Sequence, residues 1–285
     1  MKTYVLLTGR GNNTLKDKNI LSCFGHPVLY YPANAAKKAK TVDMLFCSSD
    51  DDKILSETAK YGHISIKRPD ELALPTSQHI DCIIHALNFI EEQYDRPDIL
   101  VVTLANNVTI KSEWIDACVK MMQDDDELSA VVPVYEDNDH HPYRAKTIDK
   151  NGCLQMFENV IGNLSTNRQD LPTCYFLSHN FWVLNVDKLL KSNGKGQQPW
   201  SFMGDNIGYF KIDDSIDIHN KTDLLIAEEW VKNNYIDFDL KTKKNIGEND
   251  ELTTPTTGGG ITSDNLAILH KFSCGSNLVK GGAAA

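Results

Sequence analysis

The apolar run Tyr4-Val5-Leu6-Leu7 passes directly into a basic, glycine-containing loop, Thr8-Gly9-Arg10-Gly11-Asn12-Asn13-Thr14-Leu15-Lys16-Asp17-Lys18-Asn19. The apolar run predicts a buried strand. Gly9 and Gly11 allow close backbone approach, so that backbone N–H groups can point at phosphate oxygens, and the loop's arginine and lysines add full charges. This layout is typical of a triphosphate-binding loop. It meets neither the P-loop pattern nor the dinucleotide fingerprint, and a polar turn after a strand is by itself commonplace.

Further apolar runs alternate with segments of helical periodicity along the first half of the chain. The predicted strands are 42–47, 63–66, 98–102 and 130–134, and the predicted helices are 50–61, 79–89 and 112–123. Such alternation indicates parallel strands joined by crossover helices, the three-layer α/β class, whose ligands bind at the carboxyl ends of the strands. The loop after Leu7 and the segment after Val102 both lie at that edge.

The pattern changes after Val134. Residues 136–172 are polar and are predicted to be a segment inserted into the α/β body, of the kind that serves as a lid or a dimer contact. Strands are expected to return at 174–186 and 207–212, followed by a helix at 223–231. The predicted organisation is one domain over 1–235, followed by a linker and a short C-terminal tail of unknown role over 236–285.

Composition excludes several classes of protein. A hydrophobic content of 41% and a charged content of 24% are those of an ordinary soluble domain, and a net charge of -10 argues against nucleic acid as a partner. No apolar run reaches the roughly 18 residues needed to cross a membrane, and no signal peptide is visible, so a cytoplasmic protein is expected. The seven cysteines lack metal-binding spacing and are interpreted as reduced core residues.

Several stretches together resemble one family, the cytidylyltransferases that make CMP-activated acidic sugars. These are the CMP-sialic acid synthetases and their acylneuraminate and Kdo relatives. The first loop is similar to the signature Arg-Gly-Gly-Ser-Lys-Gly-x-Lys-x-Lys-Asn, and Arg68-Pro69-Asp70-Glu71-Leu72-Ala73 is similar to Arg-Pro-x-Glu-Leu-Ala. Further matches follow in the family's order over roughly residues 3–230: Ile80-Asp81, His85-Ala86-Leu87, His140-His141-Pro142-Tyr143, Arg168-Gln169-Asp170-Leu171-Pro172 and Ser215-Ile216-Asp217-Ile218.

The resemblance implies a nucleotide-diphospho-sugar-transferase-like, Rossmann-like fold, a homodimer, and transfer of CMP from CTP to an acidic acceptor with release of pyrophosphate and with Mg²⁺ as cofactor. Developing phosphoryl charge needs preorganised cations. The residues that it implies are, as catalytic groups, Arg10, Lys18 and Asp217; as nucleotide-binding groups, Gly9, Arg10, Lys16, Lys18, Asn19, Arg68 and His79; and as metal ligands, Asp217 and His219.

The chain departs from the family where the acceptor is expected. Leu104-Ala105-Asn106-Asn107-Val108-Thr109-Ile110 replaces Gln-Pro-Thr-Ser-Pro-Leu-Arg, so the polar groups expected for a sialic acid are missing. The first loop also lacks one lysine, and histidine replaces an expected carboxylate at 219 and an expected serine at 79. We therefore expect a small acidic acceptor other than ordinary sialic acid, either another nonulosonic-type sugar acid or a small phosphonate. The candidate acceptor-binding residues are Asn106, Asn107, Arg168, Gln169 and His179.

Alternative interpretations remain open at the sequence level. The chain could be a catalytically inactive relative that acts as a nucleotide-binding or interaction module. A glycosyltransferase is disfavoured, because Leu104-Ala105-Asn106 supplies no Asp-x-Asp after the central strand. Individually, Lys16 and Lys18 could be surface lysines, Arg68 an ion-pairing arginine and Asp217 a helix cap.

Overall fold

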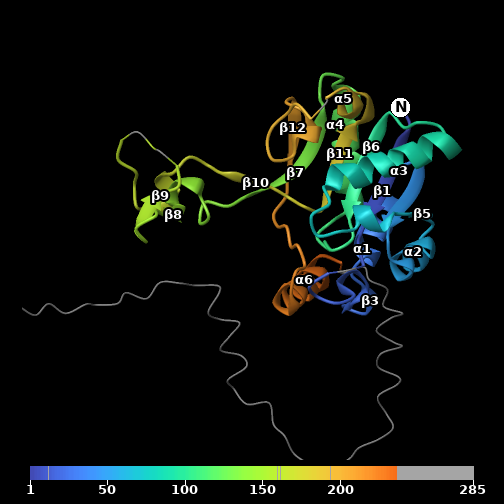
Figure 1. Cartoon of the computed structure of the whole chain (residues 1–285), viewed down its shortest axis with the longest axis horizontal. Coiled ribbons are helices and arrows are strands. Elements are labelled where there is room, and N and C mark those ends of the chain that lie inside the picture. The colour runs from blue at the N-terminus through green and yellow to red at the C-terminus, as the bar shows by residue number, and fades with distance from the viewer. Residues whose placement is uncertain (12, 159, 161, 193, 236–285) are drawn as a thin grey trace, which may run out of the picture. The chain divides into compact units, whose positions relative to one another are not determined.

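The centre of the fold is an eight-stranded sheet with the strand order β10-β7-β11-β6-β1-β4-β5, and β12 pairs with β7 (Figure 1). The structure is a computed structural model that describes residues 1–11, 13–158, 160, 162–192 and 194–235, all within the unit Met1–Ile236. The strands of the sheet are β1 (Thr3–Thr8), β4 (Met44–Ser49), β5 (Ile64–Lys67), β6 (Ile99–Leu104), β7 (Ala130–Glu136), β10 (Tyr175–Leu177), β11 (Phe181–Asn185) and β12 (Ile207–Lys211). The predicted linker and tail, 236–285, lie outside the described residues.

The sheet is mostly parallel, as predicted. Strand β1 pairs in parallel with β4 on one side and with β6 on the other, and Thr8 lies level with Ser48 and Leu104. Strands β10 and β11 are antiparallel to their neighbours. Because β1, β4 and β6 run in the same direction, their carboxyl ends meet at one edge, and the loop after β1 begins there.

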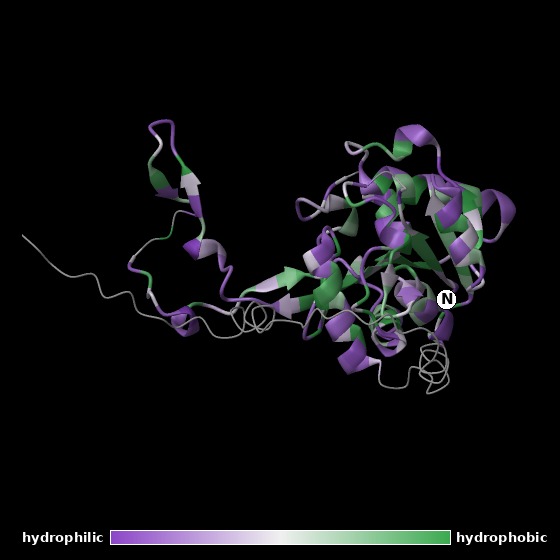
Figure 2. Ribbon diagram, turned by 90° about the horizontal axis from the view of Figure 1, so that it is seen from below, coloured by the Kyte–Doolittle hydropathy of each residue, from purple (hydrophilic) through white to green (hydrophobic). Residues whose placement is uncertain are grey.

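Helices cover both faces of the sheet and give the predicted three layers. They are α1 (Tyr30–Lys38), α2 (Asp52–Ala59), α3 (His79–Gln93), α4 (Ser112–Asp124), α5 (Val186–Lys191) and α6 (Lys221–Asn234). Leu6 belongs to the apolar cluster that contains Ile83 of α3, whereas Leu7 belongs to the cluster that contains Leu55 of α2. Alternate side chains of a strand point to opposite faces, so β1 is buried on both. In Figure 2 the hydrophobic colour is concentrated on the strands of the sheet.

An inserted segment leaves the sheet between β7 and β10, close to the predicted bounds of 136–172. It contains the short helices η3 (Pro142–Arg144) and η4 (Arg168–Asp170) and the hairpin of β8 (Lys146–Ile148) and β9 (Leu154–Met156), which we call the arm hairpin (Figure 1). At the base of the segment the backbone N–H of Cys174 donates to Asn138 Oδ1 at 2.9 Å, and His141 Nε2 lies 3.1 Å from the carbonyl oxygen of Pro172. These contacts hold the two ends of the segment together.

Shorter elements complete the described chain. They are η1 (Lys18–Ile20), η2 (Asp70–Leu72), η5 (Ser201–Met203) and the two-residue strands β2 (Ser22–Cys23) and β3 (His26–Pro27). Among the described residues, no helix combines the length and the apolar character needed to cross a membrane.

Candidate functional site

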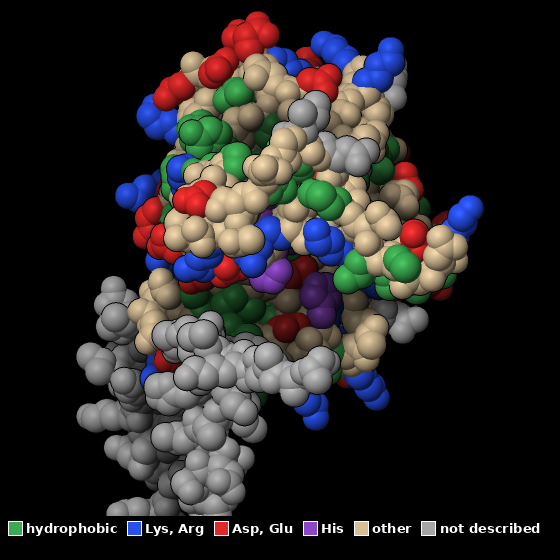
Figure 3. Space-filling view, turned by 90° about the vertical axis from the view of Figure 1, so that its left-hand side faces the viewer, with side chains coloured by type: hydrophobic (Ala, Val, Ile, Leu, Met, Phe, Trp, Pro, Cys, Tyr) green, Lys and Arg blue, Asp and Glu red, His purple; other side chains and the backbone are tan. Residues whose placement is uncertain are grey.

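A cavity of about 430 Å³ opens at the carboxyl edge of the parallel strands. Figure 3 shows basic and histidine side chains gathered around a hollow on one face of the molecule. Most of the lining comes from the loop after β1, and the rest comes from the ends of β5 and β6, the start of α3 and the segment before α6. The lining residues are Thr8, Gly9, Arg10, Asn13, Thr14, Leu15, Lys18, Asn19, Arg68, His79, Leu104, Asn106 and His219.

The loop after β1 requires glycine at two positions because its backbone passes close to other elements. A Cβ atom at Gly9 would lie 2.9 Å from the Cβ of Ala105, and one at Gly11 would lie 2.6 Å from Asp51 Oδ2. Asn19 fixes the loop from inside, since its Nδ2 donates to the carbonyl oxygen of Arg10 at 3.0 Å. At both glycines the close neighbours are protein side chains, and the backbone N–H of Gly11 donates to Asp50 Oδ1 at 3.0 Å, so the approach of this backbone to phosphates stays a prediction.

The cavity holds basic groups that lack acidic partners. Arg10, Lys18 and Arg68 all line it, and within the described part of the chain none of the three has a carboxylate within 4.0 Å. Arg68 is only 5% exposed, and its guanidinium donates to the hydroxyl oxygen of Ser48 at 3.2 Å and to its carbonyl oxygen at 2.8 Å. Positive charges that are partly desolvated and unpaired favour an anionic ligand.

The remaining arginines behave differently. Arg96 lies 3.3 Å from Glu91, Arg144 lies 3.9 Å from Asp139, and Arg168 lies 2.7 Å from the same aspartate. Outside the cavity, therefore, every arginine has a carboxylate within 4.0 Å, and Arg144 and Arg168 share Asp139. The guanidinium groups of the cavity are therefore the ones that can pair with an anionic ligand.

Burial lowers the pKa of two groups in the cavity. It lowers the pKa of Lys18, an effect to which the neighbouring Arg10 adds and which Asp217 opposes. It also lowers the pKa of His79 to about 4, with smaller contributions from Arg68 and His179. His79 is therefore neutral near pH 7, and its Nε2 lies 3.0 Å from the hydroxyl oxygen of Thr8.

The segment before α6 brings a carboxylate to the same edge of the sheet. Asp217 accepts a hydrogen bond from Asn106 Nδ2, its second oxygen lies 3.0 Å from His219 Nε2, and Lys18 Nζ donates to the carbonyl oxygen of Ile218 at 3.1 Å. Among the described residues, no group of three or more His, Cys, Asp or Glu side chains is arranged so that it could hold a metal ion by itself. The donor set fits Mg²⁺ only where phosphates and water complete the coordination, because Mg²⁺ prefers oxygen ligands and the His219 nitrogen is a poor donor for it.

Of the other predicted site residues, some line the cavity and others do not. Asn106 lines the cavity, but Asn107 is fully buried, and its Oδ1 accepts from the backbone N–H of Thr109 at 2.9 Å. His179 is partly buried, with its ring centroid 5.2 Å from that of Trp200, and burial lowers its pKa. Lys16 is exposed and is not a lining residue, and Arg168 and Gln169 lie in η4 of the inserted segment.

The sequence reasoning missed a second cavity of about 440 Å³ that shares His79 with the first. Its walls are mainly apolar, and they come from α3, α5 and the loop that leads to η5. The lining residues are Gln78, His79, Ile80, Ile84, Leu189, Leu190, Ser192, Gly194, Pro199, Trp200, Ser201 and Phe202. One feature of the sequence could have indicated this cavity. Pro199-Trp200-Ser201-Phe202 contains two aromatic residues that fit neither the period of a strand nor that of a helix.

Comparison with known proteins agrees with this geometry. A sequence model of the family described as Cytidylyltransferase matches residues 10–166, more than half of the chain. CMP-N,N'-diacetyllegionaminic acid synthase of Campylobacter jejuni is 25% identical over 221 residues, which cover 76% of this chain and 89% of that protein.

Two solved structures share the fold. A CMP:2-keto-3-deoxy-manno-octonic acid synthetase complexed with CTP superposes with a TM-score of 0.61 at 13% identity, over 82% of this chain and 99% of that one. A 4-diphosphocytidyl-2C-methyl-D-erythritol synthase from Anaerococcus prevotii superposes with a TM-score of 0.56 at 12% identity, over 81% and 96% of the respective chains. The family match, taken with the unpaired cations at the strand ends, shows that the chain belongs to the cytidylyltransferase family of CTP-dependent nucleotidyltransferases.

Proposed function

We propose that this cytidylyltransferase transfers CMP from CTP to a nonulosonic-type sugar acid and releases pyrophosphate. The observation that carries the proposal is the pair of adjacent cavities. One is lined by Arg10, Lys18 and Arg68, which have no acidic partner in the part of the chain that the structure describes, and the other is mainly apolar and shares His79 with it. The similarity to a synthase of CMP-N,N'-diacetyllegionaminic acid supports a sugar acid as acceptor.

We assign the triphosphate to the basic part of the first cavity. Arg10 and Lys18 stand in the loop after β1 and can meet the charge of the phosphates, with the exposed Lys16 as a more distant helper. Asn19 and Arg68 present an amide and a planar guanidinium that suit the edge of a cytosine or a ribose hydroxyl. His79, neutral near pH 7, adds one donor or acceptor beside them without adding charge.

The proposed reaction is a displacement at the α-phosphorus of CTP. An acceptor hydroxyl oxygen forms the new bond to phosphorus, the bond from phosphorus to the bridging oxygen of the β-phosphate breaks, pyrophosphate leaves, and the hydroxyl proton passes to solvent. Arg10 and Lys18 stabilise the charge that develops on the leaving pyrophosphate. Mg²⁺, when bound, would supply further charge neutralisation at the phosphates, and Asp217 is the residue that would hold it, with His219 beside it.

We assign the acceptor to the second cavity and its junction with the first. The apolar walls of the second cavity suit the acyl groups or the methyl group of a modified sugar acid; they are formed by Ile80, Ile84, Trp200 and Phe202. Asn106 offers a polar group at the edge of the nucleotide cavity. His179 contacts the ring of Trp200 and is a further candidate. The predicted partners of the acceptor, Arg168 and Gln169, lie in η4 and line neither cavity, and Arg168 is paired with Asp139 at 2.7 Å.

We also propose that the enzyme is a homodimer that buries the arm hairpin. Ile148 and Leu154 are cross-strand partners, and they are 70% and 69% exposed. Met156 shares their face by strand alternation, and Phe157, which follows it, is 65% exposed. Exposed apolar side chains gathered on one hairpin are typical of a protein contact.

The acceptor is tested by mass spectrometry of products and by pyrophosphate release with CTP, Mg²⁺ and a panel of acids: acylated nonulosonic acids, N-acetylneuraminate and small phosphonates. We expect a CMP-linked product with an acylated nonulosonic acid other than N-acetylneuraminate. N-acetylneuraminate should be a poor acceptor, because Leu104–Ile110 lacks the Gln and Arg expected for it. A product only with a phosphonate, or efficient CMP-neuraminate synthesis, would contradict the assignment.

A further inference from the structure

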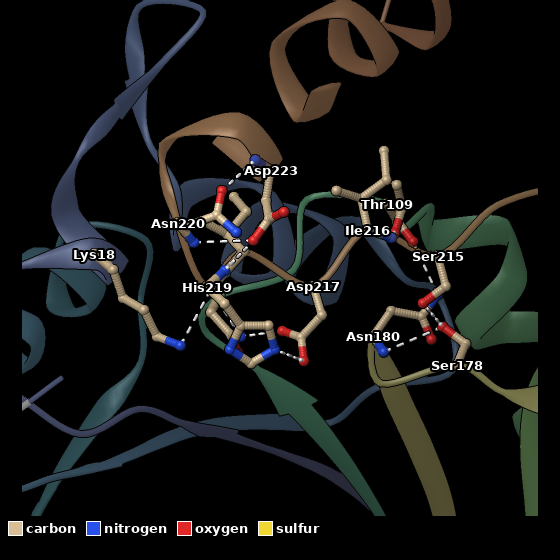
Figure 4. Close-up of polar contacts among 12 residues, drawn as sticks. Lys18, Thr109, Ser178, Asn180, Ser215, Ile216, Asp217, His219, Asn220 and Asp223 are labelled. Carbon is tan, nitrogen blue, oxygen red and sulfur yellow. Dashed lines mark hydrogen bonds and ion pairs between the residues drawn. The ribbon is translucent and has the colours of Figure 1, made fainter. Parts of the chain in front are cut away.

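A network of buried polar contacts holds the segment 215–218 against the carboxyl edge of the sheet (Figure 4). The backbone N–H of Ile216 donates to Thr109 Oγ1 at 3.1 Å, Asn180 Nδ2 donates to the carbonyl oxygen of Thr109 at 2.8 Å, and Ser178 Oγ donates to Ser215 Oγ at 2.7 Å. Thr109, Ser178 and Asn180 are all 0% exposed. The network therefore connects the segment to the chain that follows β6 and to the chain that precedes β11.

The segment held in this way carries the groups proposed to act on the phosphates. Asp217 forms an antiparallel bridge with Asn107, and the backbone N–H of Ile218 donates to the carbonyl oxygen of Asn106 at 3.0 Å. The carbonyl oxygen of Ile218 then accepts from Lys18 Nζ at 3.1 Å. The backbone position of residues 216–218 therefore determines where the Asp217 carboxylate lies and where the Lys18 ammonium is held by its hydrogen bond to Ile218.

Thr109 is the residue on which these contacts converge. Its hydroxyl donates to Asn107 Oδ1 at 2.5 Å and accepts from Ile216, while its carbonyl oxygen accepts from Asn180. Loss of the hydroxyl would leave the part-buried Ile216 N–H without this partner, and it would remove one of the two hydrogen bonds that the buried Asn107 Oδ1 accepts from Thr109.

The far end of the segment is fixed independently. Asn220 caps α6 through bonds from the backbone N–H groups of Thr222 and Asp223, and Asp223 Oδ2 accepts from the backbone of His219 at 2.7 Å and of Asn220 at 2.9 Å (Figure 4). Because the helix end is anchored without Thr109, a change at Thr109 shifts the part of the segment that carries Asp217 and leaves the fold of α6 in place.

We propose that Thr109 is a positioning residue for the bound nucleotide, acting through Ile216 on Asp217 and Lys18. The proposal rests on the roles given above to Asp217 and Lys18 at the triphosphate, and it does not depend on which acceptor the enzyme uses. Residues that orient the ligands of a metal or a phosphate, without touching it, typically contribute about 10- to 100-fold to affinity or activity.

The test is isothermal titration calorimetry of CTP with Mg²⁺ and without acceptor, on the full chain. Thr109→Val keeps the shape of the side chain and removes the hydroxyl, whereas Thr109→Ser keeps the hydroxyl. We expect Thr109→Val to weaken CTP binding by about 10- to 100-fold and Thr109→Ser to bind nearly as the wild type does. The matched control is Thr58→Val, which removes another fully buried hydroxyl that donates to the carbonyl oxygen of Ile54 at 3.0 Å in α2; its CTP affinity should be unchanged.

Hydrogen exchange at the Ile216 amide separates a positioning role from a merely structural one. In Thr109→Val this amide should exchange faster while amides in the strands of the sheet keep their protection. Faster exchange with wild-type CTP affinity would overturn the proposal, as would equal weakening in Thr109→Ser. If Thr109→Val fails to fold, Thr109→Ala, which also removes the hydroxyl that accepts from the Ile216 N–H, serves instead, and unchanged CTP affinity in that variant would overturn the proposal. Since no acceptor is present, failure of the proposed sugar acid as substrate does not affect this test.

Discussion

At the scale of single residues, the groups proposed to hold the nucleotide come from separate parts of the chain and meet in one cavity. Five of the predicted nucleotide-binding residues line this cavity: Arg10, Lys18, Asn19, Arg68 and His79. They were predicted from their positions after apolar runs and from family motifs. Their contacts with a nucleotide remain a prediction.

Asn107 shows the limit of that reasoning. Its position after β6 suggested a group facing a ligand, yet its Oδ1 accepts hydrogen bonds from the backbone and hydroxyl of Thr109 inside a turn. An asparagine in such a place can serve either the turn or a ligand, and only the tertiary path of the loop decides between them.

His63 leads to a prediction about stability and pH. It is 4% exposed, and neither ring nitrogen has a hydrogen-bond partner within the described chain. Burial, with a smaller effect of Lys37, lowers its pKa from 6.5 to about 4. Between these values the unfolded state binds a proton that the folded state does not, so the free energy of unfolding falls as the pH drops from 6.5 to 4 and levels off below.

We expect His63→Phe to remove this contribution, which amounts to about 1.4 kcal/mol for each pH unit in that window. Urea unfolding of both proteins near pH 7 and near pH 5 measures it. His79, with a similarly lowered pKa, should leave part of the decline in the variant. An identical loss of stability in both proteins on acidification would show that His63 does not titrate as described.

At the scale of elements, apolar periodicity predicted most strands and helices of the α/β body. The order of strands was harder to predict. Strand β11 inserts antiparallel between β6 and β7, and it follows a long insertion rather than a helix. Its residues, Phe181–Asn185, read only as a buried run, and a run of that kind carries no information on direction or neighbours.

The proposed burial of the arm hairpin in a dimer leads to a prediction about two substitutions in β9. Leu154 and Gln155 are adjacent on β9 and point to opposite faces, so Leu154→Glu and Gln155→Glu add the same charge on different sides. Leu154→Glu should weaken the dimer at least about tenfold, because it buries a charge against an apolar partner, and Gln155→Glu should not. Sedimentation equilibrium of the three proteins checks this. A monomeric wild type, or a dimer that is equally stable in Leu154→Glu, would contradict the proposed interface.

At the scale of the whole molecule, the distribution of charge points to one site. The chain has a net charge of -10, yet Arg10 and Arg68, the two arginines that have no carboxylate partner among the described residues, both line the cavity at the carboxyl edge of the sheet. The position of this edge could be predicted from the alternation of strands and helices. The second cavity could not be predicted, because α3, which forms one part of its wall, is far in the sequence from α5 and the loop before η5, which form the other.

The most direct test of the account is turnover of CTP, followed by pyrophosphate release with the best acceptor, in Arg10→Ala beside Arg96→Ala. Arg96 is the matched control, since it is an arginine outside the cavity, 3.3 Å from Glu91. We predict that Arg10→Ala lowers turnover at least about 100-fold while its melting temperature stays close to that of the wild type, and that Arg96→Ala keeps its activity. Wild-type turnover in Arg10→Ala, or an equal loss in Arg96→Ala, would contradict the claim that the unpaired arginines of the cavity hold the triphosphate.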